Sequence, residues 1–441
     1  MDFEFVEHMP EESHNSVLGK DFGDVIYGAD AQQLWLKMMA AGPVIASPLD
    51  PKHVVTTTAE ASNQVLRDPG VFSSGPDALY FGSDTGAIPL QIDPPDHSRY
   101  RKLLDPLFTP KLMNAREDQI VAIVNRLIDQ FIERGSCDFS NEFALPFPSE
   151  MFLTLMGLPM SELDSFQRVK EDMIRPAGNT DEERIAKQGE ASMWIVNFIN
   201  AAMAERETKE SDDILSYFLK LEKEGILTRE ETLNICILFI PAGLDTVTDS
   251  LENTFAYLAQ HPEHRKQIVD NPELIHLAVE ELLRYETPVP SVVRITRQDT
   301  EVSGCPLSKG TRVRVSLAAI NLSETTVANP MDVDFTREVN PHVAFGAGIH
   351  RCVGSYLARI ELRVALREWH KRIPEYSLQP GFELKYRRGL REIDQLPSGI
   401  RFDTSKKTPP CSVPLPALTS ELIALATSSR GSNSGGRRLL S

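Results

Sequence analysis

The sequence lacks the features that would place the protein outside the cell or in a membrane. Its five cysteines include no C-x-x-C pair and no disulfide-like spacing, which favours a reducing compartment. The most continuous apolar run, residues 233–244, is interrupted by Asn234 and is too short to span a bilayer. Residues 1–12 are acidic and lack the basic-then-apolar order of a signal peptide. We therefore predict a cytoplasmic protein without a membrane partner.

An excess of positive charge is also absent. The formal net charge of −17 disfavours nucleic acid and anionic membranes as partners. The sequence has no internal repeat and no Gly/Ser linker before its far C-terminal end, so one large domain is the better interpretation of its 441 residues. Residues 1–30 show little periodicity and predict an irregular arm, residues 31–41 predict a helix, and the β-branched residues 54–58 predict a strand. Residues 403–441 are rich in Ser, Pro and Gly and predict a disordered tail.

What the sequence does contain is a glycine-punctuated cysteine loop, FGAGIHRCVG, at residues 345–354. Gly346 and Gly348 allow positive φ angles and a close backbone approach. Such a loop can aim amide N–H groups at the Cys352 sulfur, where they would stabilise a thiolate and tune any metal that it binds. A buried structural cysteine is one alternative. A G-x-G-x-x-G nucleotide loop is another, but Arg351 stands where its third glycine should be.

Three further residues of this loop suit a broad, planar cofactor. Gly354 would let the backbone lie flat against it, Phe345 supplies an apolar wall, and His350 supplies a donor at the rim. One thiolate on one planar cofactor indicates a haem-thiolate site. The loop resembles the cysteine-ligand signature of the cytochrome P-450 family, F-x-x-G-x-x-x-C-x-G. This resemblance implies heme b with the Cys352 thiolate as axial ligand, and contacts from Gly346.

A second informative stretch is the pentapeptide AGLDT within a predicted helix over residues 233–260. This helix is apolar nearly all round in its early turns, which predicts a buried position. An acid beside a hydroxyl on such a helix is costly unless it has a task. The string resembles the family's A-G-x-[D/E]-T, in which Thr246 would hold dioxygen and a water while Asp245 gates proton entry. Ala242 and Gly243 would open the groove for the small ligand.

Candidate haem propionate ligands occur in two places. His97 and Arg101 lie at i and i+4 on a helix that Asp93 is predicted to cap, so both project from one face. Two donors one turn apart suit a pair of carboxylates, and they resemble the family's H-x-x-x-R. Arg294 matches the family's third propionate ligand, and Arg297 is the competing choice.

The resemblance also assigns structural and substrate-contacting residues. Glu281 and Arg284 match the family's E-x-x-R, and Arg337 stands where the family supplies the third member of a buried triad that locks the cysteine loop. Pro241 removes an N–H inside the predicted helix, so we expect a kink or widened turn there. A glycine-rich loop over residues 70–90 would lie over the haem, with candidate substrate contacts at Leu79, Tyr80, Phe81 and Ile88.

The family fold implied is mainly α with a small β region, and the haem domain would cover residues 31–402. The reaction implied is insertion of one oxygen atom from O2 into a C–H bond. Residues 331–335 and 368–374 look most like the camphor-hydroxylase branch, which favours a compact, terpenoid-like hydrophobic substrate, with steroids or fatty acids as alternatives. A peroxide-driven haem-thiolate peroxygenase and a non-catalytic haem sensor remain rival functions.

The electron source is predicted from what is missing. The sequence has no flavin or nicotinamide motif and no second redox domain, so electrons must come from a separate protein, a ferredoxin with its NAD(P)H reductase. Basic residues cluster in sequence around the haem-contacting segments, against an otherwise acidic composition, and would suit an acidic ferredoxin. They are Arg99, Arg101, Lys102, Arg351, Arg359 and Arg363.

Overall fold

The computed structural model describes the chain over residues 31–46, 52–79, 86–209, 211–387, 390–394, 396 and 400–402. The arm predicted for residues 1–30 and the tail predicted for residues 403–441 lie outside these ranges. Tyr80 and Phe81, two of the predicted substrate contacts, lie outside them as well.

Helices dominate the described chain, in agreement with the predicted fold class. The helices are α3 (Ala31–Ala41), α4 (Ala59–Arg67), α5 (His97–Leu104), α6 (Pro110–Asn114), α7 (Glu117–Asp129), α8 (Pro146–Met156), α9 (Leu163–Ile174), α10 (Asp181–Thr208), α11 (Ile214–Lys223), α12 (Arg229–Gln260), α13 (Pro262–Asp270), α14 (Ile275–Glu286), α15 (Leu317–Asn321) and α16 (Ser355–Arg372). The short helical turns include η3 (Asp105–Phe108), the π-helical η5 (Ser140–Ala144) and η8 (Gly348–His350).

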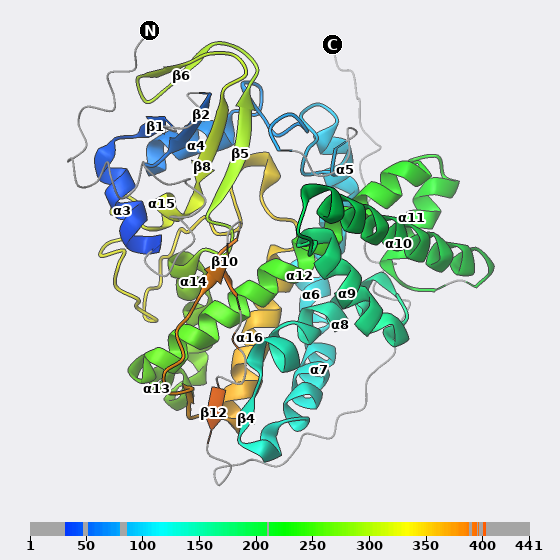
Figure 1. The fold of residues 1–441 in the computed structure, drawn as a ribbon, viewed down its shortest axis with the longest axis vertical. Coiled ribbons are helices and arrows are strands. Elements are labelled where there is room, and N and C mark those ends of the chain that lie inside the picture. Colours follow the sequence, from blue (N-terminus) through cyan, green and yellow to red (C-terminus); the bar gives the residue numbers. More distant parts are fainter. Residues whose placement is uncertain are drawn as a thin grey trace, which may run out of the picture.

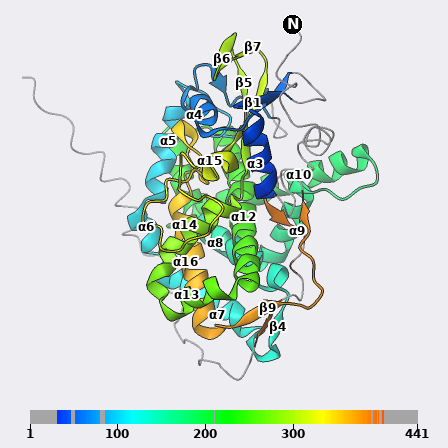
Figure 2. The ribbon, with the colours of Figure 1, turned by 90° about the vertical axis from the view of Figure 1, so that its left-hand side faces the viewer.

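The strands are short and form small sheets. They are β1 (Val44–Ala46), β2 (His53–Thr56), β3 (Phe72–Ser73), β4 (Ser136–Cys137), β5 (Ser291–Thr296), β6 (Thr300–Val302), β7 (Cys305–Leu307), β8 (Arg312–Ser316), β9 (Tyr376–Leu378), β10 (Tyr386–Arg387), β11 (Glu392–Ile393) and β12 (Ile400–Phe402). The largest sheet has the order β1-β2-β8-β5-β3, in which only β2 and β8 pair in parallel. Two views at right angles place its strands at one end of the molecule and α7 and α13 at the other (Figure 1, Figure 2).

Local sequence accounts for two of these elements. The helix predicted over residues 31–41 is α3, with Trp35 and Met38 on its buried face. The strand predicted over residues 54–58 ends earlier, at Thr56, because Thr58 begins the next helix. Its side chain accepts a hydrogen bond from Ala61 N–H and caps α4.

The long helix α12 is the axis of the helical region. It begins with a capping box in which Thr228 and Glu231 satisfy each other's backbone N–H groups. The helix is α-helical without interruption from Arg229 to Gln260, and Pro241 lies inside it. The helix thus has no π-helical turn at Pro241, and the alternative expectation, a kink, stays a prediction. Helices α8, α10, α14 and α16 all contact α12, which crosses the middle of the molecule (Figure 1).

One property of α12 resembles that of a membrane span. Among the described residues it is the one helix long and apolar enough to cross a bilayer, with a mean hydropathy of 1.2 over its most apolar window. However, 56% of that window is buried inside the protein. The composition of α12 is thus that of a core helix.

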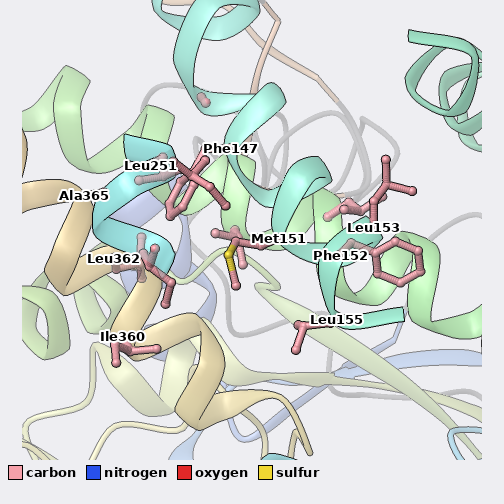
Figure 3. Close-up of a cluster of buried hydrophobic side chains, with 14 of the residues drawn as sticks. Phe147, Met151, Phe152, Leu153, Leu155, Leu251, Ile360, Leu362 and Ala365 are labelled. Carbon is pink, nitrogen blue, oxygen red and sulfur yellow. The ribbon is translucent and has the colours of Figure 1, made fainter. Parts of the chain in front are cut away.

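The main core joins α12 to the helix that follows the cysteine loop. Figure 3 shows side chains of α8, α12 and α16 converging, among them Met151, Leu251 and Leu362. Nearby, the ring centroids of Phe255 and Trp369 lie 5.0 Å apart. Aromatic pairs of this kind contribute about 0.5–1.5 kcal/mol beyond the area that they bury. This packing fixes α16, and with it the C-terminal end of the cysteine loop, relative to α12.

Candidate haem-thiolate site

The cysteine loop has the backbone geometry that its glycines predict. Gly346 and Gly348 have φ angles of 69° and 70°, a region that favours glycine. A Cβ atom at Gly348 would lie 2.3 Å from the carbonyl oxygen of Leu66, so no larger residue fits there. The amide of Cys352 donates to the carbonyl oxygen of Phe345 at 2.8 Å and closes the loop.

Charged and polar groups surround the Cys352 sulfur. Burial raises the pKa of the Cys352 thiol, whereas the N–H of Gly354 and the positive charges of Arg101, Arg351 and Arg359 act in the opposite direction. The predicted amide donor is therefore present. These groups would stabilise a thiolate on a metal ion.

The cysteine loop and α12 both leave open space where a ligand is expected. The side chain of Cys352 is accessible although protein atoms enclose it closely enough for burial to dominate its pKa. Ala242 and Gly243 are exposed in the middle of α12, next to residues that are buried. A Cβ atom at Gly354 would meet no atom within 4 Å, and one at Gly243 would meet only Phe152, at 3.9 Å. Both the cysteine loop and the middle of α12 therefore have room beside them for a ligand.

The predicted propionate ligands lie together beside the cysteine loop. The rings of His97 and His350 have centroids 4.4 Å apart, and both Nε2 atoms are buried with no hydrogen-bond partner among the described residues. Burial, followed by the charges of Arg294, His97 and Arg101, lowers the pKa of His350 to about 3. Burial also lowers the pKa of Arg294 to about 10. An anionic group would relieve each of these penalties, so the cluster fits the two carboxylates of haem b.

The competing arginine has other partners. Arg297 makes an ion pair with Asp77 at 2.5 Å and donates to Ser73 Oγ at 2.5 Å. Arg294 has no carboxylate within ion-pair distance in the described chain, and its guanidinium donates to the carbonyl of Val293 at 2.8 Å. The geometry favours Arg294 over Arg297 as a propionate ligand.

The predicted capping role of Asp93 is wrong. The residue before α5 is Asp96, which makes no side-chain capping bond. The carboxylate of Asp93 instead accepts hydrogen bonds from Ser73 Oγ and from Ser74 N–H. Because these two donors occupy its carboxylate, Asp93 connects the end of the strand β3 to the turn that precedes α5.

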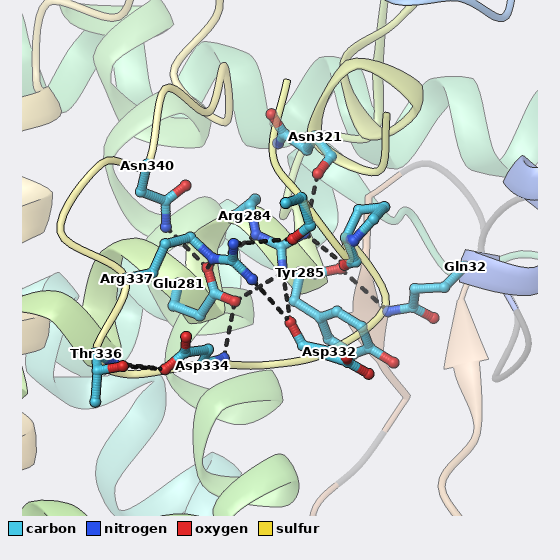
Figure 4. A network of polar contacts seen from close by, with 12 residues as sticks. Gln32, Glu281, Arg284, Tyr285, Asn321, Asp332, Asp334, Thr336, Arg337 and Asn340 are labelled. Atoms are coloured by element: carbon cyan, nitrogen blue, oxygen red, sulfur yellow. Dashed lines mark hydrogen bonds and ion pairs between the residues drawn. The ribbon is translucent and has the colours of Figure 1, made fainter. Parts of the chain in front are cut away.

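The predicted E-x-x-R triad is assembled on α14 (Figure 4). Glu281 and Arg284 pair at 2.8 Å with both side chains fully buried, and Arg337 lies 3.3 Å from Glu281. Glu281 also accepts from the amide of Asp334 and from the side chain of Asn340. Arg284 donates to the carbonyl oxygens of Asn321, Pro330 and Asp332. Because every charge has partners, this buried pair fixes the chain that leads into the cysteine loop.

On α12, the predicted oxygen-site residues have different surroundings. The hydroxyl of Thr246 donates to the carbonyl oxygen of Ala242 at 3.1 Å. Asp245 is buried and makes ion pairs with Lys170 at 2.6 Å and with Arg175 at 3.3 Å. The sequence prediction did not include these two cations. A signal existed, since Lys170 follows Phe166 and Val169 at helical spacing on the buried face of α9.

Further buried acids extend along α12 beyond Asp245. Burial raises the pKa of Glu252 to about 8, against an opposing hydrogen bond from Ser140. Burial raises the pKa of Asp249 well above its usual range, and the charges of Glu392, Glu252 and Asp245 act in the same direction. At both positions burial outweighs the opposing contacts and favours the protonated carboxyl group.

The predicted basic cluster divides into paired and unpaired residues. Arg99 pairs with Glu231 at 2.6 Å, Arg101 with Asp105 at 2.7 Å, and Arg359 with Glu280 at 2.7 Å. No hydrogen bond or ion pair engages the other three side chains within the part of the chain that the structure describes. These are Lys102, Arg351 and Arg363.

The predicted substrate contacts that can be placed differ in exposure. The side chain of Leu79 is 48% exposed, whereas Ile88 is buried in the main core. Leu79 is therefore available to a ligand, and Ile88 is engaged in packing.

Three comparisons with known proteins agree with this geometry. The family model Cytochrome P450 matches residues 40–369. The chain is 35% identical over 331 residues to the probable cytochrome P450 127A1 of Sinorhizobium fredii, covering 74% of this chain and 78% of the relative. CYP109E1 from Bacillus megaterium, in complex with testosterone, aligns with a TM-score of 0.76 and 27% identity over 84% of this chain and 97% of the other. P450BioI, in complex with an acyl carrier protein that carries hexadec-9Z-enoic acid, aligns with a TM-score of 0.77 and 26% identity over 87% of this chain and 100% of the other.

The helical fold around α12, with its cysteine loop and its cluster of arginine and histidine donors, defines a haem-thiolate protein. The chain belongs to the cytochrome P450 family. It is a haem-thiolate monooxygenase whose cofactor is haem b with a cysteine thiolate axial ligand. The predicted fold class and family are confirmed.

Proposed function

We propose that Cys352 supplies the axial thiolate and that His97, Arg101, Arg294 and His350 hold the propionates, within a haem domain spanning residues 31–402. The observation that carries this assignment is the cluster of buried donors beside the cysteine loop. Two of its members, His97 and His350, have buried Nε2 atoms that find no hydrogen-bond partner in the described part of the chain. Phe345, Gly346, Ala242, Gly243 and Gly354 complete the contacts by leaving apolar or open surface.

The protein contributes proton handling to the reaction. Bound haem supplies the chemistry that activates O2 and inserts one oxygen atom into a C–H bond. Thr246 Oγ1 would hold a water or ligand in the groove after leaving the carbonyl of Ala242. Asp245, ion-paired with Lys170 and Arg175, would gate the entry of protons from solvent to that water. Positioned proton transfer contributes about 10²–10⁴-fold to a rate.

The electron donor in this proposal is a ferredoxin with its NAD(P)H reductase, in the cytoplasm. Lys102, Arg351 and Arg363 offer cationic groups that are not neutralised by an ion pair within the described chain. Cationic groups of this kind favour encounter with an acidic protein, and salt weakens that attraction.

The substrate in this proposal is a compact hydrophobic molecule, with a terpenoid-like compound favoured by the camphor-hydroxylase resemblance. Phe152 is the side chain nearest to the groove at Gly243. Steroids and fatty acids are the alternatives, since one structural neighbour was solved with testosterone and another with a fatty acyl chain. A screen of terpenes, steroids and fatty acids for the substrate-induced spectral shift will separate the three classes.

The test of the proposed site is the spectrum of the reduced carbon monoxide complex. We expect the wild type to show the long-wavelength band that marks a thiolate ligand, and we expect Cys352→Ser and Cys352→His to lose it. Cys305→Ser is the control, because Cys305 is buried in the strand β7. Retention of the band in either Cys352 variant would refute the ligand assignment. Turnover with ferredoxin, compared with turnover on peroxide, tests the electron source.

A further inference from the structure

Two adjacent glutamates of α14 hold successive segments of the chain that leads to Cys352. Glu281 belongs to the E-x-x-R network and holds residues 334–340 (Figure 4). Its neighbour Glu280 has different partners. Its carboxylate accepts from His342 Nε2 at 2.9 Å and from Arg359 Nε and Nη2 at 2.7 and 2.8 Å. Glu280 therefore connects α14 to the start of the cysteine loop and to α16.

Arg359 makes a second contact, with the loop itself. Its guanidinium lies over the ring of Phe345, 4.3 Å from the ring centroid, and its two-pronged bond to Glu280 fixes its plane. A cation in this position is attracted by the face of an aromatic ring. Arg359 is thus anchored on one side by Glu280 and covers Phe345 on the other.

His342 completes the arrangement from the other end of the loop. Its side chain is 2% exposed. Nδ1 accepts the amide hydrogen of Ala344 at 3.2 Å, so the ring hydrogen lies on Nε2 and is donated to Glu280. The centroids of the His342 and Phe345 rings are 6.2 Å apart. Phe345 is thereby in contact with both partners of Glu280.

We propose that Glu280, His342 and Arg359 form a clamp, the Glu280 clamp, which positions Phe345 and through it the Cys352 sulfur. The physical link is the hydrogen bond from the Cys352 amide to the Phe345 carbonyl, at 2.8 Å, because a shift of Phe345 displaces the ligand. The clamp makes Arg359 a positioning residue rather than a docking residue for the electron donor. This inference rests on the proposed haem site.

The clamp holds its charge at any working pH. Burial alone would raise the pKa of Glu280, but the hydrogen bond from His342 and the hydrogen bond and charge of Arg359 outweigh it and lower the pKa to about 2. The carboxylate therefore remains ionised and neutralises Arg359, which leaves little net charge for an acidic partner to recognise.

The test compares Arg359→Gln, Arg359→Lys and Glu280→Gln with the control Arg363→Gln, which lies on the same helix without an ion pair in the described chain. In holoenzyme, we expect deuterium exchange of the amides at 345–352 to rise about tenfold in Arg359→Gln and Glu280→Gln. We also expect part of their reduced carbon monoxide complex to lose the thiolate band. Arg359→Lys should show exchange and spectra between those of these variants and the wild type, since lysine keeps the charge but cannot make the bidentate hydrogen bond.

Kinetics with an acidic ferredoxin separate positioning from docking. The clamp predicts an unchanged KM for ferredoxin in Arg359→Gln, together with the exchange and spectral changes. A raised KM with wild-type exchange and spectrum would overturn the clamp. If Arg359→Gln does not fold, the deuterium exchange of Arg359→Lys tests the clamp in its place. If Cys352→Ser keeps the thiolate band, the proposed haem site fails. If instead the clamp variants match the wild type in exchange and spectrum, only the clamp is refuted.

Discussion

Two neighbouring helices, α12 and α14, use buried carboxylates in opposite ways. On α14, beside the cysteine loop, partners outweigh burial and lower the pKa of Glu280 and Glu281. On α12, burial prevails and raises the pKa of Asp249 and Glu252. The difference lies in the partners of each carboxylate. Glu281 and Glu280 pair with the arginines Arg284 and Arg359, whereas Glu252 accepts a hydrogen bond from a serine hydroxyl. A carboxylate therefore fixes a loop where arginines pair with it, and its protonated form is favoured where burial outweighs its partners.

Asp245 lies between these two cases. It is on α12, yet it has the cationic partners Lys170 and Arg175. Arg175 also binds Glu392 at 2.6 Å, so one guanidinium links Asp245 to the strand β11. A change in any of these groups alters the charge balance around Asp245. The comparison predicts that α14 variants lose structure, whereas α12 variants lose proton handling.

The largest expected effect is the removal of the Glu281 charge. Glu281→Gln leaves Arg284 fully buried beside a neutral group, and breaking such a pair costs roughly 3–5 kcal/mol of unfolding free energy. Urea unfolding of the holoenzyme measures this loss. The matched control is Asp270→Asn in the exposed pair of Lys266 and Asp270, where about 0.5 kcal/mol or less is expected. Equal losses in the two variants would contradict the structural role of the triad.

The next largest expected effect is a loss of coupling between NAD(P)H consumption and product formation in a variant of α12. Thr246→Ala removes the hydroxyl that is bonded to Ala242 and should keep substrate binding and stability. Because proton delivery is worth about 10²–10⁴-fold, we expect the ratio of product formed to NAD(P)H consumed to fall strongly, with hydrogen peroxide as the replacement product. Thr248→Val is the control, since its hydroxyl donates to Ala144 instead. Parental coupling in Thr246→Ala would show that Thr246 is an ordinary helix residue.

Sequence patterns predicted the local features of this molecule, and the family resemblance predicted the Glu281 triad and the cluster of propionate ligands, but neither predicted the partners of Asp245 and Glu280. The helix at residues 31–41 and the positive φ angles of Gly346 and Gly348 follow from neighbouring residues. The partner of Asp245 does not, because Lys170 is 75 positions away and pairs with it only after α9 packs beside α12. Glu280 pairs with a residue 79 positions away for the same reason. Ion-pair partners depend on tertiary packing, which periodicity does not specify.

The pH dependence of stability tests the contrast directly. The folded-state pKa of Glu252 is about 8, above its usual 4.5, so the folded protein keeps a proton that the unfolded chain has lost. Its contribution is complete below pH 4.5 and is lost as the pH rises to 8. Glu252→Gln should remove this loss, which is on the order of a few kcal/mol. Urea unfolding at pH 5 and about pH 8.5 measures it, and identical pH profiles of variant and wild type would contradict the raised pKa.

Glu280 should show the opposite sign. Its folded-state pKa of about 2 lies below the usual 4.5, so its contribution is present above pH 4.5 and is lost as the pH falls to 2. Glu280→Gln should flatten the profile in this acidic window only. The two glutamine variants thus change opposite ends of one stability curve, and a shared window for both would refute the distinction between the two helices.

The smallest expected effect concerns Arg363 and the binding of the electron donor. Arg363 shares α16 with the clamped Arg359 but has no ion pair in the described chain, so its charge is available to a partner. An exposed charge contributes up to about 1 kcal/mol, so Arg363→Glu should raise the KM for an acidic ferredoxin about fivefold at low salt. The effect should vanish near 1 M salt, where the screening length is about 3 Å. The substrate-induced spectral shift and the thiolate band should stay unchanged, because Arg363 is not placed in the haem or substrate contacts. Equal KM values for wild type and Arg363→Glu at low salt would remove Arg363 from the donor surface and leave Lys102 and Arg351 as its candidates.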